Sequence, residues 1–479
     1  MKKTILYSIA ALFLTAGCVS NLDDDFNIDP KKATDVPAAT LVSNAQFNLT
    51  SIITTPDYNY NPFRYYLQYW AAVQYPDESQ YNINSREINK AFWDVIYRDV
   101  LSDLREARKT VDANAFLTAG ERASQVAAIE ILEVYAWSVL VNTFGNIPYS
   151  QALDINNVLA AYEDDGAIYA DLIKRLDAAI ASLNAHPDAS GFSTGDLYYG
   201  GDTESWLKFA NSLKLRFALT IADVEPANAK KLAEEAAAHV FTSPEEDAQL
   251  NYTANMPTAN PMSDILAKRD DNVAANTLVD VMNKLSDPRI DEFFQPATAG
   301  PNAGKYVGGV YGVANAYARY AQPGTLLRDP VLPGLLLSYT EVEFLLAEAK
   351  LRGFNVPGTA AAHYNAAVTS SIVHDFGGTQ AEASTYLTKP GVVFDAANWK
   401  KSIGTQKWIA MHNQPVEGWK EWRRLDYPVL QKPAQALSEI PLRFPYPFSE
   451  QNLNGANYRA AATAMGGDEV TSRIFWDKP

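Results

Sequence analysis

The stretch from Gly120 to Phe144 constrains the fold more than any other part of the chain. Its apolar side chains recur as in a helix but point in nearly every direction around the axis. A helix of this kind has to be buried among other helices, because a surface helix keeps one polar face. The residues that give the pattern are Ile129, Ile131, Leu132, Val134, Trp137, Val139, Leu140 and Val141. The sequence therefore predicts a large, mostly helical core.

Helical periodicity recurs along most of the chain from about Leu41 onward. We predict further helices over Ala91–Val111, Ala167–Asn184, Trp206–Asp223, Ala227–Val240, Leu278–Leu285, Tyr339–Arg352 and Thr359–Phe376. Consecutive helices of this length stack as antiparallel pairs in tetratricopeptide-like units, although no strict repeat period is visible here. The stretches between them read as irregular and loop-rich: Thr54–Asn84, Asn251–Asp270, Pro296–Pro333 and Thr388 to the C-terminus. Loops of that length usually carry function.

The helix over Tyr339–Arg352 has the clearest end signals. Ser338 and Glu341 have the spacing of a capping box, in which each side chain bonds to a backbone N–H of the other residue. Glu348 and Arg352 are spaced for an ion pair on the solvent side. Gly353 follows, which favours a left-handed stop at the end of the helix.

The N-terminus has the features of a bacterial secretory signal with a lipoprotein cleavage site. Two lysines are followed by the apolar stretch Ile5–Ala16 and then by Gly17-Cys18, which holds the single cysteine of the chain. We therefore predict a signal peptide over residues 1–17 and lipid attachment at Cys18, with palmitate among the acyl chains. Residues 18–40, which include the acidic run Asp23–Asp25, read as a lipidated tether, and residues 41–479 as the folded domain.

The charge balance excludes one large class of partners. The chain has 40 Lys and Arg against 56 Asp and Glu, giving a formal net charge of −16. A nucleic-acid-binding protein needs a basic surface to displace counterions from phosphates, so we expect no nucleic-acid partner.

The usual cofactor and catalytic motifs are absent from the sequence. Gly300 to Lys305 resembles a phosphate-binding loop, but it has one residue too few between its glycines, and Tyr306 replaces the required Ser or Thr. With one cysteine and scattered histidines, we expect neither a metal site nor a cofactor. A pair of carboxylates of the glycosidase type cannot be recognised from sequence, so a secreted glycoside hydrolase stays open as an alternative.

Several motifs, in order along the chain, resemble the SusD/RagB family of nutrient-binding outer-membrane lipoproteins. They are Phe144–Leu153, Asp196–Asp202 with Trp206–Arg216, Ser338–Ala349, Trp419–Arg424, Ile440–Pro447 and Arg473–Asp477. Each also has a structural explanation: Trp206, Phe209 and Leu213 form a core stripe. We expect Arg423 and Arg424 to pair with buried acids rather than to bind ligand. The motifs therefore identify the scaffold rather than a binding site.

The resemblance implies a SusD-like fold with about four tetratricopeptide-like helix pairs and an irregular, loop-rich, ligand-facing half. It implies a lipid-anchored protein at the outer membrane, facing the cell exterior and without catalytic activity. Its partner would be a SusC-like TonB-dependent transporter, to which it delivers an oligosaccharide or a peptide. A structural or adhesive surface protein is a third reading of the chain.

We predict the ligand-binding site in two aromatic-rich loop segments. Nine of the residues from Asp57 to Asn82 are aromatic, and Lys305–Tyr320 adds four tyrosines around three glycines. Sugars pack their C–H faces on aromatic rings, and their hydroxyls bond to planar amide, carboxylate or guanidinium groups. The predicted residues are Trp70, Tyr75, Asp77, Tyr81, Asn82, Tyr306, Tyr311, Asn315, Tyr317 and Arg319. Trp70 also falls on a helical core stripe with Phe63, Tyr66 and Leu67, which leaves a structural role open for it.

Overall fold

Helices that pack against their neighbours in sequence build most of the protein. A computed structural model describes residues 36–83 and 86–478, and the folded unit begins at Ala38. The predicted signal peptide, Cys18 and most of the tether lie outside the described residues. Helix α3 (Ala38–Thr54) starts slightly before the predicted domain boundary at residue 41.

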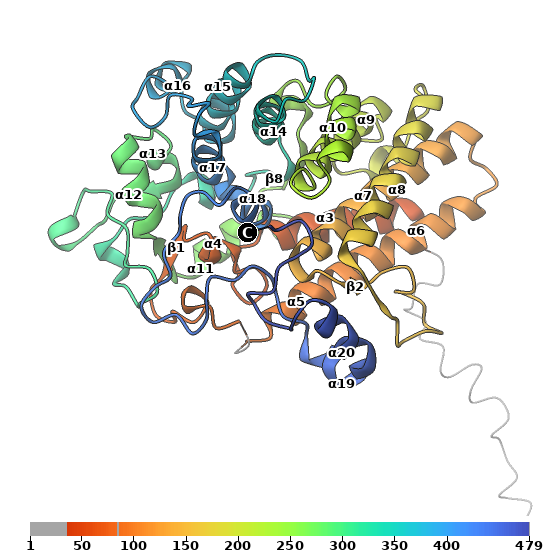
Figure 1. The fold of residues 1–479 in the computed structure, drawn as a ribbon, viewed down its shortest axis with the longest axis horizontal. Coiled ribbons are helices and arrows are strands. Elements are labelled where there is room, and N and C mark those ends of the chain that lie inside the picture. The colour runs from red at the N-terminus through yellow and green to blue at the C-terminus, as the bar shows by residue number, and fades with distance from the viewer. Residues whose placement is uncertain (1–35, 84–85, 479) are drawn as a thin grey trace, which may run out of the picture. The chain divides into compact units, whose positions relative to one another are not determined.

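The first helix pairs lie side by side in Figure 1. Helix α3 packs on the rod formed by α5 (Ile88–Asp94), the π-helical segment η3 (Val95–Leu101) and α6 (Ser102–Ala113). Helix α7 (Ala119–Phe144) packs on α8 (Asp165–Ala185), and α9 (Thr203–Thr220) on α10 (Pro226–Ala236). The last such pair is α14 (Tyr339–Leu351) with α15 (Ala360–Ser370). The predicted mostly helical fold is thereby confirmed.

Helix α7 lies in the middle of this stack, as its sequence predicts. Thr118 and Glu121 form a capping box at its start, and Gly145, at φ +78°, ends it. Among the described residues it is the one helix long and apolar enough to cross a membrane, yet 83% of its most apolar 18-residue stretch is buried in the protein. It is therefore the core helix of the fold rather than a membrane span.

The irregular half is held together by short helices and two-stranded ladders. Its helices are α4 (Phe63–Tyr66), α11 (Pro261–Lys268), α12 (Asn276–Leu285), α13 (Ile290–Phe293) and α16 (Gln380–Tyr386). The antiparallel ladders are β1 (Trp70–Ala72) with β5 (Asn272–Ala274), β2 (Ile147–Pro148) with β3 (Tyr162–Glu163), β4 (Ala248–Leu250) with β8 (Gly334–Leu337), and β6 (Phe294–Gln295) with β7 (Gln322–Pro323). These ladders fix loops from distant parts of the chain beside one another.

The prediction of a loop-rich region from Thr388 onward is wrong. That region contains α17 (Trp399–Ala410), α18 (Pro415–Leu425), α19 (Phe448–Leu453) and α20 (Gly455–Ala464). Helix α18 escaped the periodicity because its inward face carries charged residues such as Lys420 and Glu421, both at most 2% exposed. A pattern that looks for apolar stripes reads such a helix as polar.

A buried ionic network joins α9, α14, α17 and α18. Arg216 donates two hydrogen bonds to Glu341, and Arg424 bonds to both Glu348 and Glu421. Four basic and four acidic side chains take part: Arg216, Lys407, Lys420, Arg424, Glu341, Glu348, Glu417 and Glu421. Burial alone would raise the pKa of Glu348, but the neighbouring guanidinium groups of Arg424 and Arg352 hold it below its ordinary value.

The network corrects three details predicted from sequence. Ser338 does cap α14, but Glu341 turns inward to Arg216 instead of completing a capping box. Glu348 does pair with Arg352, at 2.7 Å, but it is buried rather than on the solvent side. Arg424 pairs with buried acids as expected, whereas Arg423 donates to backbone carbonyls and stacks on Trp419. The family motifs thus supply scaffold contacts.

Candidate functional site

Three loop segments meet at one edge of the β1·β5 ladder. Val73, just after β1, donates its N–H to the carbonyl of Asp271, just before β5. The N–H of Asn315 donates to the carbonyl of Ala72 at 3.0 Å. The segments just after β1, just before β5 and at Asn315 are therefore neighbours, although they are far apart in the sequence. Because β1 and β5 pair antiparallel, the exit of one strand lies beside the entry of the other.

A cluster of stacked tyrosine and arginine side chains lies at this edge. The guanidinium of Arg86 lies 4.9 Å from the ring centre of Tyr58 and 5.9 Å from that of Tyr75. Arg269 approaches Tyr58 at 5.9 Å. We call Tyr58, Tyr75, Arg86 and Arg269 the aromatic–arginine cluster. Tyr58 is buried, whereas Tyr75 is 61% exposed and presents its ring to solvent.

Acidic groups hold both arginines of the cluster in place. The Nε of Arg86 lies 3.1 Å from Glu78, with Asp77 slightly farther away, and Arg269 lies 3.1 Å from Asp271. Burial raises the pKa of Glu78 to about 7, although the nearby Arg86 opposes that rise. The arginines are thus oriented before any ligand arrives, which reduces the entropy lost on binding.

Three predicted aromatic residues lie in the core instead of at the surface. Trp70 forms part of β1 and is 1% exposed. Tyr81 ends the turn η1 (Glu78–Gln80) and accepts a hydrogen bond from Gln68, while Tyr311 donates to the carbonyl of Tyr65. Sequence could not separate these rings from exposed ones, since tyrosine is amphipathic and suits either setting. We leave all three out of the proposed site.

Asn315 is also a structural residue rather than a surface one. Its side-chain amide donates to the carbonyls of Ala72, Val310 and Val313, and its oxygen accepts the N–H of Val310. It is buried. Asn315 therefore fastens its loop to β1, and its amide is fully occupied by that task.

The structure brings some of the remaining predicted residues to the cluster. Asp77 accepts a hydrogen bond from Asn82 at 3.2 Å, and both follow Tyr75 in the same loop. Asn82 also lines a cavity of about 330 Å³, together with residues between 437 and 470. The hydroxyl of Tyr317 accepts from Arg328, and burial together with the nearby Asp270 raises the pKa of this hydroxyl. Tyr317 therefore lies near the segment that carries Arg269.

Two predicted residues lie elsewhere. The carbonyl of Tyr306 accepts from Asn283 of α12, and burial with the nearby Asp291 raises its hydroxyl pKa to about 12. Arg319 is exposed beside Gly300. Neither residue is joined to the cluster by a contact in the described chain, so the two predicted segments contribute unequally.

Sequence reasoning missed Arg269 and Asp271. Their signal was the charged run 269–271 directly before a short apolar stretch that forms β5. Nothing in the sequence shows that this stretch pairs with β1. Among the described residues no group of three or more His, Cys, Asp or Glu side chains is placed to hold a metal ion.

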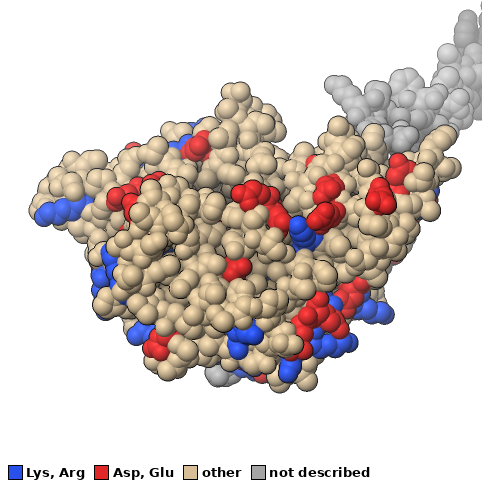
Figure 2. Space-filling model, turned by 90° about the horizontal axis from the view of Figure 1, so that it is seen from above, with Lys and Arg blue, Asp and Glu red and all other residues tan. Residues whose placement is uncertain are grey.

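Surface charge fits the acidic composition. On the face shown in Figure 2, Asp and Glu form several groups, and Lys and Arg are scattered without a continuous basic stripe. This face therefore offers no basic surface complementary to a nucleic-acid phosphate backbone.

Helix pairs beneath a loop-built surface of stacked rings and oriented guanidinium groups define a helical binding protein. A SusD-like family model, described as "Starch-binding associating with outer membrane", matches residues 30–447. The chain belongs to this family. No curated protein matches the sequence.

Solved structures support the same fold. A chitin-binding protein superimposes with a TM-score of 0.80 at 26% identity, covering 92% of this chain and 100% of its own. A chitin-binding SusD homologue from Flavobacterium johnsoniae gives 0.79 at 26%, covering 92% and 98%. A SusD homologue from Bacteroides uniformis gives 0.75 at 25%, covering 92% and 99%. The SusD-like fold class predicted from the motifs is confirmed.

Proposed function

We propose that this protein is a non-catalytic, lipid-anchored surface protein that captures an oligosaccharide and delivers it to a SusC-like TonB-dependent transporter. The family is described as associating with the outer membrane, and two similar structures are of chitin-binding proteins. We propose an oligosaccharide rather than a peptide as the ligand, because the exposed side chain of the site is the ring of Tyr75, which lies beside the guanidinium of Arg86.

The observation that carries the proposal is the geometry of Tyr75 and Arg86. An exposed ring offers a flat face to the C–H groups of a sugar, and ring stacking of this kind contributes about 1–3 kcal/mol by analogy with bases. Arg86, oriented by Glu78, can donate to sugar hydroxyls beside that ring. Asp77 adds an acceptor in the same loop.

Attachment and delivery rest on other parts of the chain. Acylation of Cys18 would anchor the protein in the outer membrane, facing the exterior. The paired helices offer rigid surfaces for the transporter, and we assign α8 to that contact. Charge reversal on exposed positions of α8 should weaken co-purification with the transporter and leave glycan affinity unchanged; the opposite result would move the contact elsewhere.

A binding and turnover assay tests the proposed function. The full chain is applied to an array of glycans and peptides, and each retained ligand is then incubated with the protein and analysed for cleavage. We expect at least one glycan to be retained and recovered intact. Cleavage would favour the alternative of a secreted glycoside hydrolase, and retention of peptides alone would replace the sugar with a peptide ligand.

A further inference from the structure

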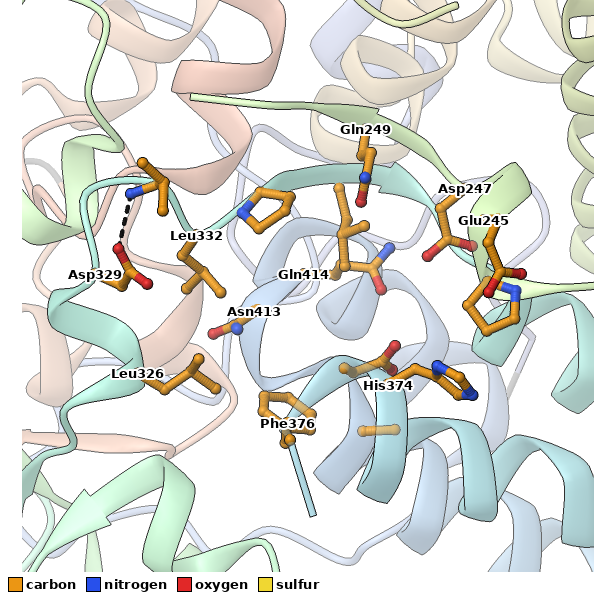
Figure 3. A pocket seen from close by; sticks show the side chains of 17 residues that line it. Glu245, Asp247, Gln249, Leu326, Asp329, Leu332, His374, Phe376, Asn413 and Gln414 are labelled. Carbon is orange, nitrogen blue, oxygen red and sulfur yellow. Dashed lines mark hydrogen bonds between the residues drawn. The ribbon is translucent and has the colours of Figure 1, made fainter. Parts of the chain in front are cut away.

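A second cavity, of about 490 Å³, shares no lining residue with the aromatic–arginine cluster. Its walls come from the β4·β8 ladder, the turn η8 (Leu326–Arg328), residues 374–377 after α15, and residues 410–414 after α17 (Figure 3). Arg328 of η8 contacts Tyr317, whereas Leu326 and Asp329 line the cavity. The turn η8 thus lies between Tyr317 and the cavity.

The cavity is acidic, and its lining contains neither Lys nor Arg. Four acids line it: Asp247 is buried, Asp375 and Asp329 are half-buried, and Glu245 is exposed. The only other titratable group in the lining is His374, which is exposed. One oxygen of Asp247 accepts the N–H of Tyr339, and Figure 3 shows its carboxylate on the same side of the cavity as Glu245.

Two amides in the cavity have polar atoms without a partner in the described chain. The Nε2 of Gln414 is buried and unbonded, although its oxygen accepts from Ser338. Gln414 is only 7% exposed and reaches into the middle of the cavity in Figure 3. The Oδ1 of Asn413 is likewise unbonded. Buried amide groups normally have partners, and a molecule that supplies an acceptor and a donor would satisfy both atoms.

The rest of the lining suits a small organic molecule. Leu326, Leu332, Leu335 and Phe376 give apolar walls between the polar groups. Pockets for small ligands combine such walls with a few directed polar side chains. In the described chain no three acids of the lining lie close enough together to hold a metal ion, so an organic cation fits the cavity better.

The raised pKa values of two lining acids also favour a positively charged ligand. Burial raises the pKa of Asp375 to about 7, and burial together with Asp375 raises that of Asp247 well above its ordinary value. Arg289 and Thr340 oppose the rise at Asp375 without removing it. A cation in the cavity would lower the pKa of both acids, since an opposite charge favours the ionised form.

We propose that this cavity binds a primary ammonium group with a neighbouring oxygen acceptor, held by Asp247 and Asp375 with Gln414 donating to the oxygen. An amino sugar and the amino end of a peptide both carry this chemistry. The site is separate from the aromatic–arginine cluster and does not depend on the proposed function.

Calorimetric titration of the full chain tests the proposal. The probes are glucosamine disaccharide and the dipeptide amide Ala-Ala, each paired with its N-acetylated form. We expect saturable binding of at least one ammonium probe, and the two arms identify its source. Asp247→Asn/Asp375→Asn keeps the shape of both side chains and should weaken binding by about tenfold or more, because two charges facing the ammonium are removed. Asp188→Asn, at an exposed acid outside the cavity, is the matched control and should bind as wild type.

A second variant, at an exposed residue, keeps the test valid if the first variant does not fold. Val331 is 45% exposed at the mouth of the cavity, so Val331→Arg adds a competing cation without disturbing the core. It too should weaken binding of the ammonium probe. The proposal is overturned if neither ammonium probe binds more tightly than its acetylated form, or if both variants bind the probe as wild type does.

Discussion

Replacing Arg424 with Met tests whether the buried ionic network holds the helical scaffold together. The substitution keeps the length of the side chain and removes one of four buried cations. Arg424 bonds to Glu348 of α14 and to Glu421 of α18, so its loss leaves two carboxylates short of donors. All three side chains are at most 3% exposed, so water cannot take over those bonds.

The expected magnitude follows from this burial. Removing one partner of a buried ion pair costs about 3–5 kcal/mol, because the remaining charge stays buried without compensation. Unfolding entropy scales with chain length, so for a protein of this size each kcal/mol lowers Tm by roughly 1 °C. Arg424→Met should therefore lower Tm by about 3–5 °C. Adding Glu348→Gln restores the balance of charges and should recover part of that loss.

Scanning calorimetry measures both variants against a surface control. Arg98 forms an ion pair with Asp99 while its side chain is 69% exposed, so Arg98→Met should cost less than about 1 kcal/mol. An Arg424→Met protein that melts with the wild type would refute the structural role of the network. A double variant no more stable than the single one would show that charge balance is not the cause.

Three further predictions concern single side chains. Asp375→Asn should stabilise the protein above pH 7 and have no effect below pH 4. The folded pKa of Asp375, about 7, exceeds its unfolded value near 3.8, so the wild type loses about 2–4 kcal/mol of stability as pH rises between these two values. Urea titrations measure this loss, and equal stability of the variant and the wild type at all pH values would contradict the prediction. Asn315→Ala should cost about 3 kcal/mol, because it leaves buried backbone groups unpaired; an unchanged melt with reduced glycan affinity would return Asn315 to the site. Cys18→Ala should release the protein from membranes, and a variant that still fractionates with the outer membrane in cells without the transporter would disprove the anchor.

The helical half was predictable because local patterns decide it. Helix α7 is apolar on all sides, and α8 and α9 carry long apolar stripes, so their positions follow from periodicity. Helix α18 was missed because its buried face is charged, and α17 buries Gln406 and Lys407 among its apolar residues. These charges are compatible with the core because they pair with one another and with Arg216 of α9 and Glu348 of α14, and partners so far apart are not visible in a single sequence.

The site was predictable in composition but not in geometry. Because Asp57–Asn82 is rich in aromatic residues, the predicted site includes the segments of Tyr58, before α4, and of Tyr75, after β1. Asp77 and Asn82 follow Tyr75 in the chain, and the site itself stays a prediction. Which rings are buried depends on the pairing of β1 with β5, a contact between distant residues. Tyr81 and Tyr311 pack together at 6.3 Å beneath the surface for that reason. The cavity of Asp247 and Asp375 had no sequence signal, since its walls come from four separate segments.

The most direct test of the account is glycan affinity at the aromatic–arginine cluster. A glycan retained on the array is titrated into the wild-type protein, into Tyr75→Ala and into Tyr60→Ala. Tyr60 lies two residues after Tyr58, in the segment before α4, and is 41% exposed, but it makes no ring contact with the cluster in the described chain, so it is the matched control. The account predicts that Tyr75→Ala binds about tenfold more weakly with an unchanged melting temperature, whereas Tyr60→Ala binds as wild type. Equal affinity of all three proteins would contradict the assignment of the site to this cluster.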